Sequence, residues 1–131
     1  MRGTPIAEGV GFSEKDRALH IRRMGQLAKM FADHGILVIC AFVSPNKKIR
    51  QEIKQNIGEN RFCEVYVKAS KKNRIKRDVK GMYKKAINGE IKNFTGYDGA
   101  YDVPRKASVI CNTDKEGVSE SVNKIFKKIF Y

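Results

Sequence analysis

The feature that most constrains the fold is a nearly continuous apolar run, Ile36 to Val43, directly after Gly35. A strand with one exposed face alternates apolar and polar residues, whereas this run does not alternate. Such a strand is buried on both faces, which is typical of a parallel sheet covered by helices. The run is too short to cross a membrane as a helix, which takes about 20 apolar residues. We therefore expect a buried strand here.

Helical and strand patterns alternate along the rest of the chain. A helix is expected to begin at Ser13, which resembles a capping box together with Asp16, and to end at Gly35. A polar helix follows, with isoleucines at every fourth residue over 49–57. The further expected elements are a strand over 62–67, one or two basic helices over 70–92, a loop over 93–104, a short strand over 108–111 and a terminal helix with an apolar stripe over 118–130.

This alternation predicts an α/β fold with parallel strands flanked by helices. A chain of 131 residues is one domain by length. Three strands make a narrow sheet, because a parallel sheet normally has both its faces and its edges covered. We therefore expect a single domain over 1–131 whose sheet is incomplete, and exposed apolar edges of such a sheet favour aggregation or a partner.

The charge of the chain points to an anionic partner. The formal net charge is +13, and between Lys68 and Lys92 ten residues are Lys or Arg while two are acidic. No nucleic-acid-binding motif accompanies this run, and nucleotide phosphates are an equally good partner for it. Nucleic-acid binding, which we do not favour, would show as strongly salt-dependent affinity.

The three cysteines, Cys40, Cys63 and Cys111, each lie in an apolar run and form no CxxC pair. Free cysteine behaves as a small apolar residue, so we expect buried structural thiols rather than metal ligands. The N-terminal residues contain no apolar signal-peptide region. A cytoplasmic location follows as the default, and no metal site is expected.

Several residues are candidates for a ligand site, because ligands bind beyond the carboxyl ends of strands in open α/β sheets. Ser44, at the end of the apolar run, either caps the next helix or contacts a ligand. Phe12 and Phe94 lie in polar loops and either pack locally or stack on a nucleobase. Arg17, near a helix start, suits an anion or a solvated surface. The segment 80–96 is either a solvated helix or a mobile lid over phosphates.

Two long motifs resemble a single family. GFSEKDRALHIRR and the later AFVSP resemble the GFS, DR, Asn-Ile-Arg-Arg and AFISP motifs of the adenylylsulfate kinases. KGMYKKAINGEIKNFTGYDGAY resembles the lid and substrate loop of that family, KGLYKKARxGEIKxFTGID. The resemblance runs from about Arg2 to the C-terminus. It implies a P-loop-kinase fold and, in sulfate assimilation, transfer of the terminal phosphate of ATP, with Mg²⁺, to the 3′-hydroxyl of adenylylsulfate.

The resemblance also implies roles for individual residues. Phe12 and Phe94 match the two aromatic residues that sandwich the adenine, and Arg17 matches the arginine that holds the phosphosulfate. Val43 and Ser44 match the pair that lines this pocket. Ser44 also matches a serine labelled as a phosphoserine intermediate, although direct in-line transfer is the more economical mechanism.

The remaining matched positions lie around the phosphates and the substrate loop. Arg2 matches the arginine of a DGDxxR motif. Lys80 and Lys92 match lid lysines near the phosphates, and Arg77 matches an arginine near the base of ATP. Thr95 follows Phe94 in the substrate loop and is predicted to contact the substrate.

The sequence departs from the family pattern at the acceptor site. His20 stands where the family has an asparagine that contacts the acceptor nucleotide, and Leu19 replaces a glutamate. An imidazole can replace one hydrogen bond of an amide but not both. A different nucleotide-linked acceptor is therefore an alternative to adenylylsulfate.

A second departure concerns the phosphate-binding loop. The sequence contains no GxxxxGK[ST] motif, whose backbone, lysine and hydroxyl hold the phosphates and magnesium, and no DGD acids. We therefore expect a partial P-loop-kinase fold without the N-terminal P-loop strand and helix, and with the protein ligands of ATP and Mg²⁺ largely absent. Little activity is expected from these residues alone. The alternative is a non-catalytic nucleotide-binding remnant, and the expected partner is a second copy or a missing N-terminal half.

Overall fold

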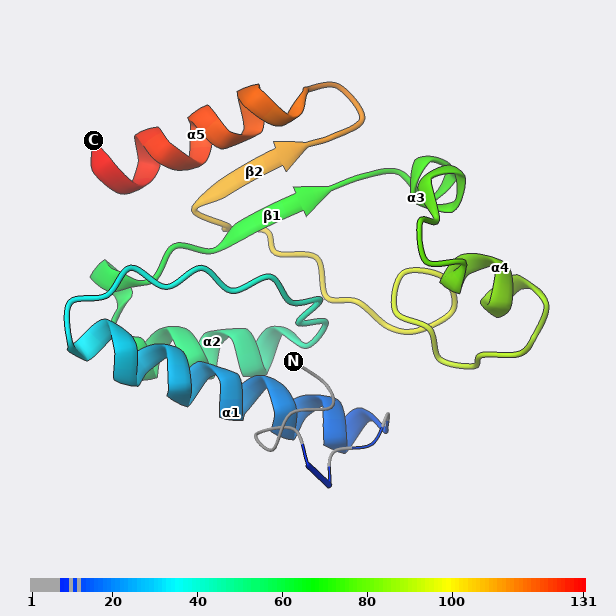
Figure 1. Ribbon diagram of the computed structural model, residues 1–131, viewed down its shortest axis with the longest axis horizontal. Coiled ribbons are helices and arrows are strands. Elements are labelled where there is room, and N and C mark those ends of the chain that lie inside the picture. The colour runs from blue at the N-terminus through cyan, green and yellow to red at the C-terminus, as the bar shows by residue number, and fades with distance from the viewer. Residues whose placement is uncertain (1–7, 10, 12) are drawn as a thin grey trace. The chain divides into compact units, whose positions relative to one another are not determined.

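The computed structural model describes residues 8, 9, 11 and 13–131 (Figure 1). The chain divides into two compact units, residues 1–62 and residues 63–131. In the first unit, Met24, Ile49 and Ile57 are the buried apolar side chains among the described residues. No helix in the described part of the chain is long and apolar enough to cross a membrane.

The first unit begins with helix α1, Glu14–Asp33. Ser13 caps it, because its side chain accepts a hydrogen bond from the backbone N–H of Asp16 at 3.1 Å, and its hydroxyl donates to the Asp16 carboxylate at 2.7 Å. The chain leaves the helix through Gly35, whose φ of 78° favours glycine. The prediction of a helix between Ser13 and Gly35 is confirmed.

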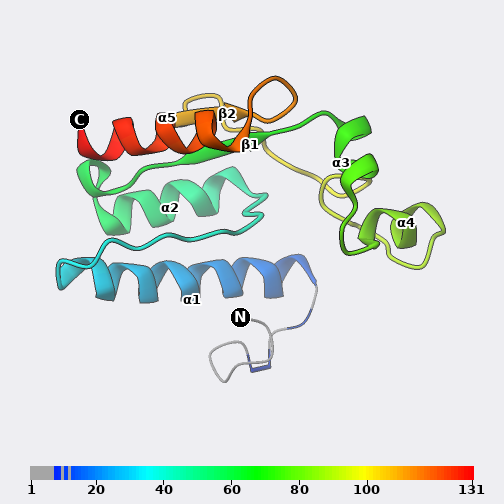
Figure 2. The ribbon, with the colours of Figure 1, turned by 45° about the horizontal axis from the view of Figure 1, so that its top comes forward.

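Helix α2, Lys47–Ile57, is the second element of this unit. Asn46 caps it by accepting a hydrogen bond from Ile49 N at 3.2 Å, and Gly58 ends it before the short 3₁₀ helix η2, Glu59–Arg61. Residues 36–43 carry the chain back, so that α1 and α2 run in the same direction side by side (Figure 2). The predicted second helix is confirmed.

The two helices of this unit meet at a glycine. A Cβ atom built on Gly25 would lie 2.9 Å from Cγ1 of Ile53 and 3.1 Å from its Cδ1. Such separations are shorter than van der Waals contact, so α2 can approach α1 this closely only where α1 carries no side chain. At this contact, therefore, a glycine of α1 packs against the branched side chain of Ile53 on α2.

The expected buried strand over Ile36–Val43 is wrong. The segment forms no ladder with any described residue, and Leu37 is 61% exposed, Ile39 87% and Val43 64%. A strand exists through hydrogen bonds to a neighbouring strand, and an apolar pattern does not supply that neighbour. Cys40, in the middle of the segment, is exposed, so its expected burial is wrong as well.

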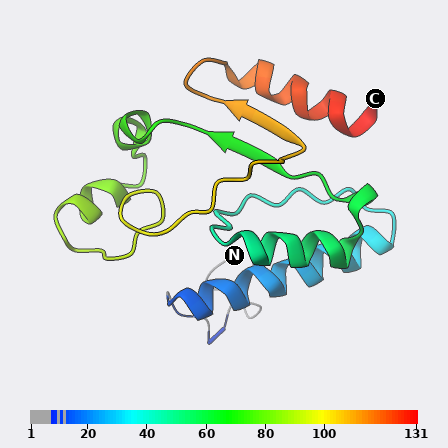
Figure 3. The ribbon, with the colours of Figure 1, turned by 180° about the vertical axis from the view of Figure 1, so that it is seen from behind.

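The second unit contains a two-stranded parallel sheet with one helix against it (Figure 3). Strand β1, Val65–Lys68, pairs with β2, Val109–Asn112, in a register that places Val65 opposite Val109. Helix α5, Val118–Phe130, packs against β2. The parallel direction is confirmed, and the sheet of the described residues has two strands rather than the predicted three.

Two short helices occupy the basic segment of this unit, α3 at Lys71–Arg77 and α4 at Met82–Ile87. The residues between α4 and β2 form a loop, whose one ladder contact is an isolated bridge between Thr95 and Gly99. The predictions of basic helices over 70–92 and of a loop over 93–104 are confirmed.

Burial in the second unit is confined to a few side chains. Cys111 on β2 is 1% exposed and packs under α5, where its thiol lies 3.9 Å from the Ser121 carbonyl oxygen. Cys63 is half-buried, so the expected burial of the cysteines is confirmed fully for Cys111 alone. The apolar stripe of α5 is largely open, with Phe126 50% exposed and Phe130 55% exposed.

Candidate functional site

The loop over 93–99 is organised by one carboxylate. Asp98 accepts hydrogen bonds from the backbone N–H groups of Asn93 at 3.0 Å and Phe94 at 2.7 Å. The Phe94 carbonyl oxygen in turn accepts from the N–H groups of Tyr97 and Gly99, both at 3.0 Å. Asn93 adopts a φ of 54°, the left-handed region that a closed turn requires. Both the amide and the carbonyl of Phe94 are therefore held by the loop itself.

The ring of Phe94 lies against Tyr83 of α4. The two ring centroids are 5.0 Å apart and the ring planes are at 84°, an edge-to-face arrangement. Gly96 allows this approach, because a Cβ on it would lie 2.7 Å from the Tyr83 hydroxyl oxygen. With a φ of 102°, Gly96 also has a conformation that other residues rarely adopt.

Helix α4 is capped by a residue that lies outside the helix. Its N-cap, Gly81, has no side chain, and Asp78 instead accepts hydrogen bonds from the N–H groups of Tyr83 and Lys84, each at 2.9 Å. Partial desolvation works against the charged form, but the N–H groups of Tyr83, Lys84 and Met82 outweigh it and hold the pKa of Asp78 below its usual value. Asp78 thus stays ionised and fixes the first turn of the helix that carries Tyr83.

Asp114 links helix α3 to the end of the sheet through hydrogen bonds. Its carboxylate accepts hydrogen bonds from Ser70 N and from the Asn73 side-chain amide, each at 2.7 Å. Arg77 adds two bonds from the other end of the helix, to the Thr113 hydroxyl at 2.9 Å and the Thr113 carbonyl at 2.7 Å. Both strands end here, and this is the edge at which ligands bind in open α/β sheets.

The bonds to Asp114 make the second unit sensitive to acid. The Asn73 amide holds the pKa of Asp114 below its usual value, with help from the Ser70 N–H and from Arg77, against a smaller opposing effect of desolvation. Because the folded pKa lies below the unfolded value of about 3.9, this stabilisation is complete above about pH 4 and lost as the pH falls through the folded pKa. We expect the difference in Tm between the parent and Asp114→Asn to be largest near pH 7 and to shrink below about pH 4. Circular-dichroism melts from neutral to acidic pH measure it, and a pH-independent difference would contradict this account.

In the first unit, Ser44 follows the apolar run with an unusual backbone conformation. Its φ is 37°, unusual for a residue with a side chain, and its carbonyl oxygen accepts a hydrogen bond from Arg50 Nη1 at 2.7 Å. Asn46, not Ser44, caps α2, so the helix-capping alternative for Ser44 is wrong. Arg50 therefore stabilises a backbone conformation that serine would otherwise rarely adopt.

His20 and Arg17 lie on the first half of α1. His20 is 8% exposed, and its ring meets Phe42 edge-on with the centroids 6.1 Å apart. Arg17 is half-buried one turn before it. The structure thus places an imidazole, rather than an amide, in the apolar surroundings between α1 and the segment that follows it.

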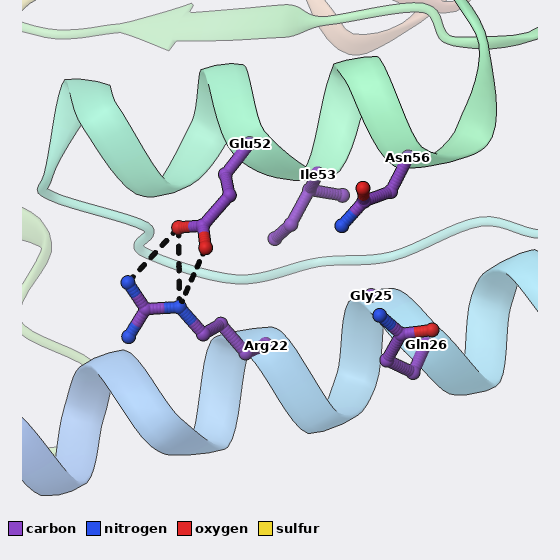
Figure 4. A pocket seen from close by; sticks show the side chains of 6 residues that line it. All are labelled: Arg22, Gly25, Gln26, Glu52, Ile53 and Asn56. Carbon is purple, nitrogen blue, oxygen red and sulfur yellow. Dashed lines mark hydrogen bonds and ion pairs between the residues drawn. The ribbon is translucent and has the colours of Figure 1, made fainter.

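Two further arginines of α1 have partners within the first unit. Arg22 on α1 forms a forked ion pair with Glu52 on α2, with Nη2–Oε2 at 2.9 Å and Nε–Oε2 at 3.1 Å (Figure 4). The bonds from Arg22 hold the pKa of Glu52 below its usual value. Arg23 donates to the Glu8 carbonyl at 3.3 Å. The pair borders a small cavity of about 70 Å³, lined by Arg22, Gly25, Gln26, Glu52, Ile53 and Asn56.

The sequence of this chain matches a known protein family. A family model described as adenylylsulphate kinase matches residues 3–112. The chain belongs to the adenylyl-sulfate kinase family. It is 41% identical over 126 residues to the adenylyl-sulfate kinase of Picosynechococcus sp. and 44% identical over 126 residues to that of Gloeothece citriformis. Each alignment covers 96% of this chain and 70% of the relative.

A solved structure extends the comparison to the fold. The APS kinase of Mycobacterium tuberculosis, crystallised with AMPPNP and APS, superposes with a TM-score of 0.86 at 28% identity, over 99% of this chain and 75% of that one. The predicted α/β kinase fold with a parallel sheet is thereby confirmed. Members of this family phosphorylate adenylylsulfate at the expense of ATP, as the sequence motifs implied.

The roles of the predicted adenylyl-sulfate kinase site residues all stay predictions, and the structure shows where the described ones lie. Phe94 and Thr95 lie together in the loop held by Asp98, whereas Lys80 and Lys92 are exposed. The predictions for Arg2 and Phe12 fall outside the described residues. The sequence interpretation did not identify Asp78, Tyr83 or Asp98 as contributors to this loop. The acid in the motif FTGYD is the signal that could have drawn attention to Asp98.

The family resemblance implies Mg²⁺, which proteins usually hold through carboxylate oxygens. Within the described ranges, no group of three or more His, Cys, Asp or Glu side chains is placed to hold a metal ion. The carboxylates of Asp78, Asp98 and Asp114, which lie around helices α3 and α4 and the loop after them, already accept hydrogen bonds from N–H groups. The described residues therefore do not fit a metal held by protein side chains.

Proposed function

We propose that this chain binds adenylylsulfate as the acceptor of an ATP-dependent phosphoryl transfer to the 3′-hydroxyl, the reaction of adenylyl-sulfate kinases. The observation that supports it most is the loop over 93–99, in which a family motif presents a half-buried Phe94 from a backbone held at both ends. An aromatic ring fixed in this way is suited to stack on the adenine base. Thr95 and Lys92 flank it and are proposed to contact the rest of the acceptor.

Other proposed contacts lie in the first unit. Arg17, half-buried on the first turns of α1, is suited to an anion because its guanidinium and the helix N-terminus both favour negative charge. Val43, His20 and Ser44 are proposed to contact the acceptor. Ser44 is proposed to shape the acceptor site through its backbone conformation rather than to carry a phosphate, since direct transfer to the acceptor hydroxyl needs no phosphoserine.

The proposed ATP side of the site consists of few residues. Arg77 and Lys80 are the residues proposed to lie near ATP. The 131 residues contain no GxxxxGK[ST] motif, and phosphoryl transfer depends on a cationic clamp around the moving phosphate. We therefore propose that acceptor binding is retained and that turnover with ATP and Mg²⁺ by these residues alone is slow. Dimer formation, a second polypeptide and a cytoplasmic location stay predictions, and nucleic-acid binding stays the alternative that we do not favour.

A calorimetric titration of the purified chain tests the proposed function. Adenylylsulfate is expected to bind saturably at one site per chain, and more tightly than ATP, because the described loop belongs to the acceptor side. A coupled assay with ATP and Mg²⁺ measures turnover in parallel. Absence of saturable binding would overturn the acceptor role, and robust turnover would overturn the claim of slow transfer. Tighter binding of another nucleotide-linked acceptor would move the proposal to that substrate, which His20 makes the first alternative.

A further inference from the structure

We propose that Tyr83 and Asp98 are positioning residues that set the orientation of Phe94 for stacking on the acceptor base. This inference rests on the proposed function, because it assigns a role to two residues around a base-binding ring. Neither residue needs to touch the acceptor. Each acts on Phe94 from a different direction, Asp98 through the backbone and Tyr83 through the ring.

Asp98 fixes the backbone position of Phe94. Its two carboxylate oxygens bind two successive N–H groups, with Oδ2 3.0 Å from Asn93 N and Oδ1 2.7 Å from Phe94 N. A charged acceptor on a backbone N–H makes a stronger bond than a neutral one. The left-handed backbone of Asn93, with its φ of 54°, leads directly into this pair of bonds. Asp98 thereby holds a turn that an isolated peptide would adopt rarely.

Tyr83 fixes how the ring of Phe94 is tilted. The planes of the two rings are at 84° with the centroids 5.0 Å apart, within the preferred range for an edge-to-face pair. Tyr83 is itself held, because its backbone N–H donates to Asp78 at 2.9 Å. Phe94 is half-buried, so Tyr83 covers part of the ring and leaves part of it for a ligand.

Gly96 keeps the loop and α4 close enough for this contact. A Cβ at position 96 would lie 2.7 Å from the Tyr83 hydroxyl and 3.0 Å from Nη1 of Arg74. The backbone of the loop therefore packs directly against Tyr83. Asp78, Tyr83, Phe94 and Asp98 form one continuous set of contacts within the second unit.

The consequence for binding is specific to the base. Stacking requires the ring to be parallel to the base, and a ring that must first be ordered binds more weakly than one already in place. Loss of Tyr83 or Asp98 is therefore expected to weaken binding of a nucleotide. Binding of an anion without a base is expected to change little.

The test compares Tyr83→Leu, Asp98→Ala and the conservative Tyr83→Phe with the parent chain, and Tyr131→Leu serves as a control at a residue that is 98% exposed. Affinity for adenylylsulfate is measured by calorimetry, and NMR of the free proteins reports the amide signals of Asn93, Phe94 and strand β2. Tyr83→Leu and Asp98→Ala are expected to weaken adenylylsulfate binding about tenfold or more, within the range that base stacking supports. Tyr83→Phe keeps the ring and is expected to stay within about twofold of the parent, because no stacking surface is removed.

Each outcome decides the inference. Weaker binding with intact β2 signals and shifted Phe94 signals supports it. Unchanged affinity in both variants, with a parent that binds, overturns it and leaves the proposed function standing. Loss of the β2 signals in both variants would mean that the two residues hold the unit together, which also overturns a positioning role. A parent chain that does not bind adenylylsulfate overturns the proposed function, and the inference with it.

Discussion

Replacing Gly25 by leucine is expected to lower the free energy of unfolding of the first unit by about 1–3 kcal/mol, the usual cost of overpacking an interface. A Cβ alone would lie 2.9 Å from Cγ1 of Ile53, and the further atoms of leucine would enter the same space. The branched Ile53 side chain has few rotamers with which to move away. The helices would have to separate, which would also stretch the ion pair between Arg22 and Glu52 shown in Figure 4.

Urea unfolding followed by circular dichroism measures this change, with NMR signals of α1 residues to assign it to the first unit. Gln26→Leu is the matched control, because it introduces the same side chain at the next position of the same helix, where the residue is exposed. Leucine and glutamine have similar helix propensities, so this control is expected to unfold within about 0.5 kcal/mol of the parent. Equal stability of the two variants would show that the helices do not depend on a glycine at their contact.

Replacing Phe94 by alanine is expected to lower the affinity for adenylylsulfate about 5- to 150-fold, which corresponds to about 1–3 kcal/mol for one stacked base. The effect is expected to be large because the ring is already oriented by Tyr83 and its backbone is already held by Asp98. Little of the stacking energy is then lost in ordering the residue. Titration calorimetry with adenylylsulfate measures the change.

Phe130→Ala is the control for this substitution. It removes the same ring from the same unit, at a position on α5 that is 55% exposed and that has no proposed contact with the acceptor. Its affinity for adenylylsulfate is expected to equal that of the parent. If Phe94→Ala also binds like the parent, the base is not stacked on this residue, and the loop serves another part of the acceptor or another ligand.

The apolar run over 36–43 shows that an apolar pattern alone does not predict a strand. Its composition correctly marked it as apolar, and its position between two predicted helices was correct. Whether it forms a strand depends on a second segment that can pair with it, and no described residue does so. Ile39, 87% exposed, has the residue type of a core position without the neighbours that make a core.

The candidate site likewise combines residues that a motif marks with neighbours that no local pattern predicts. Phe94 was recognisable as a loop aromatic within a family motif, but Tyr83, eleven positions earlier, was not recognisable as its neighbour. Asp78 was not recognisable as the cap of α4, because it lies five and six residues before the N–H groups it binds. Contacts of this kind follow no short spacing rule.

Patterns in the sequence were sufficient to predict the helix boundaries at Ser13 and Gly35, the parallel α/β class and the family. Those features depend on hydrogen bonds between residues a few positions apart, or on motifs that are contiguous in the chain. Two features became visible only in the folded structure: residues 36–43 pair with no strand among the described residues, and Tyr83 and Asp98 contact Phe94. Those features depend on which segments meet in space, and that is set by the packing of the folded units rather than by any local pattern.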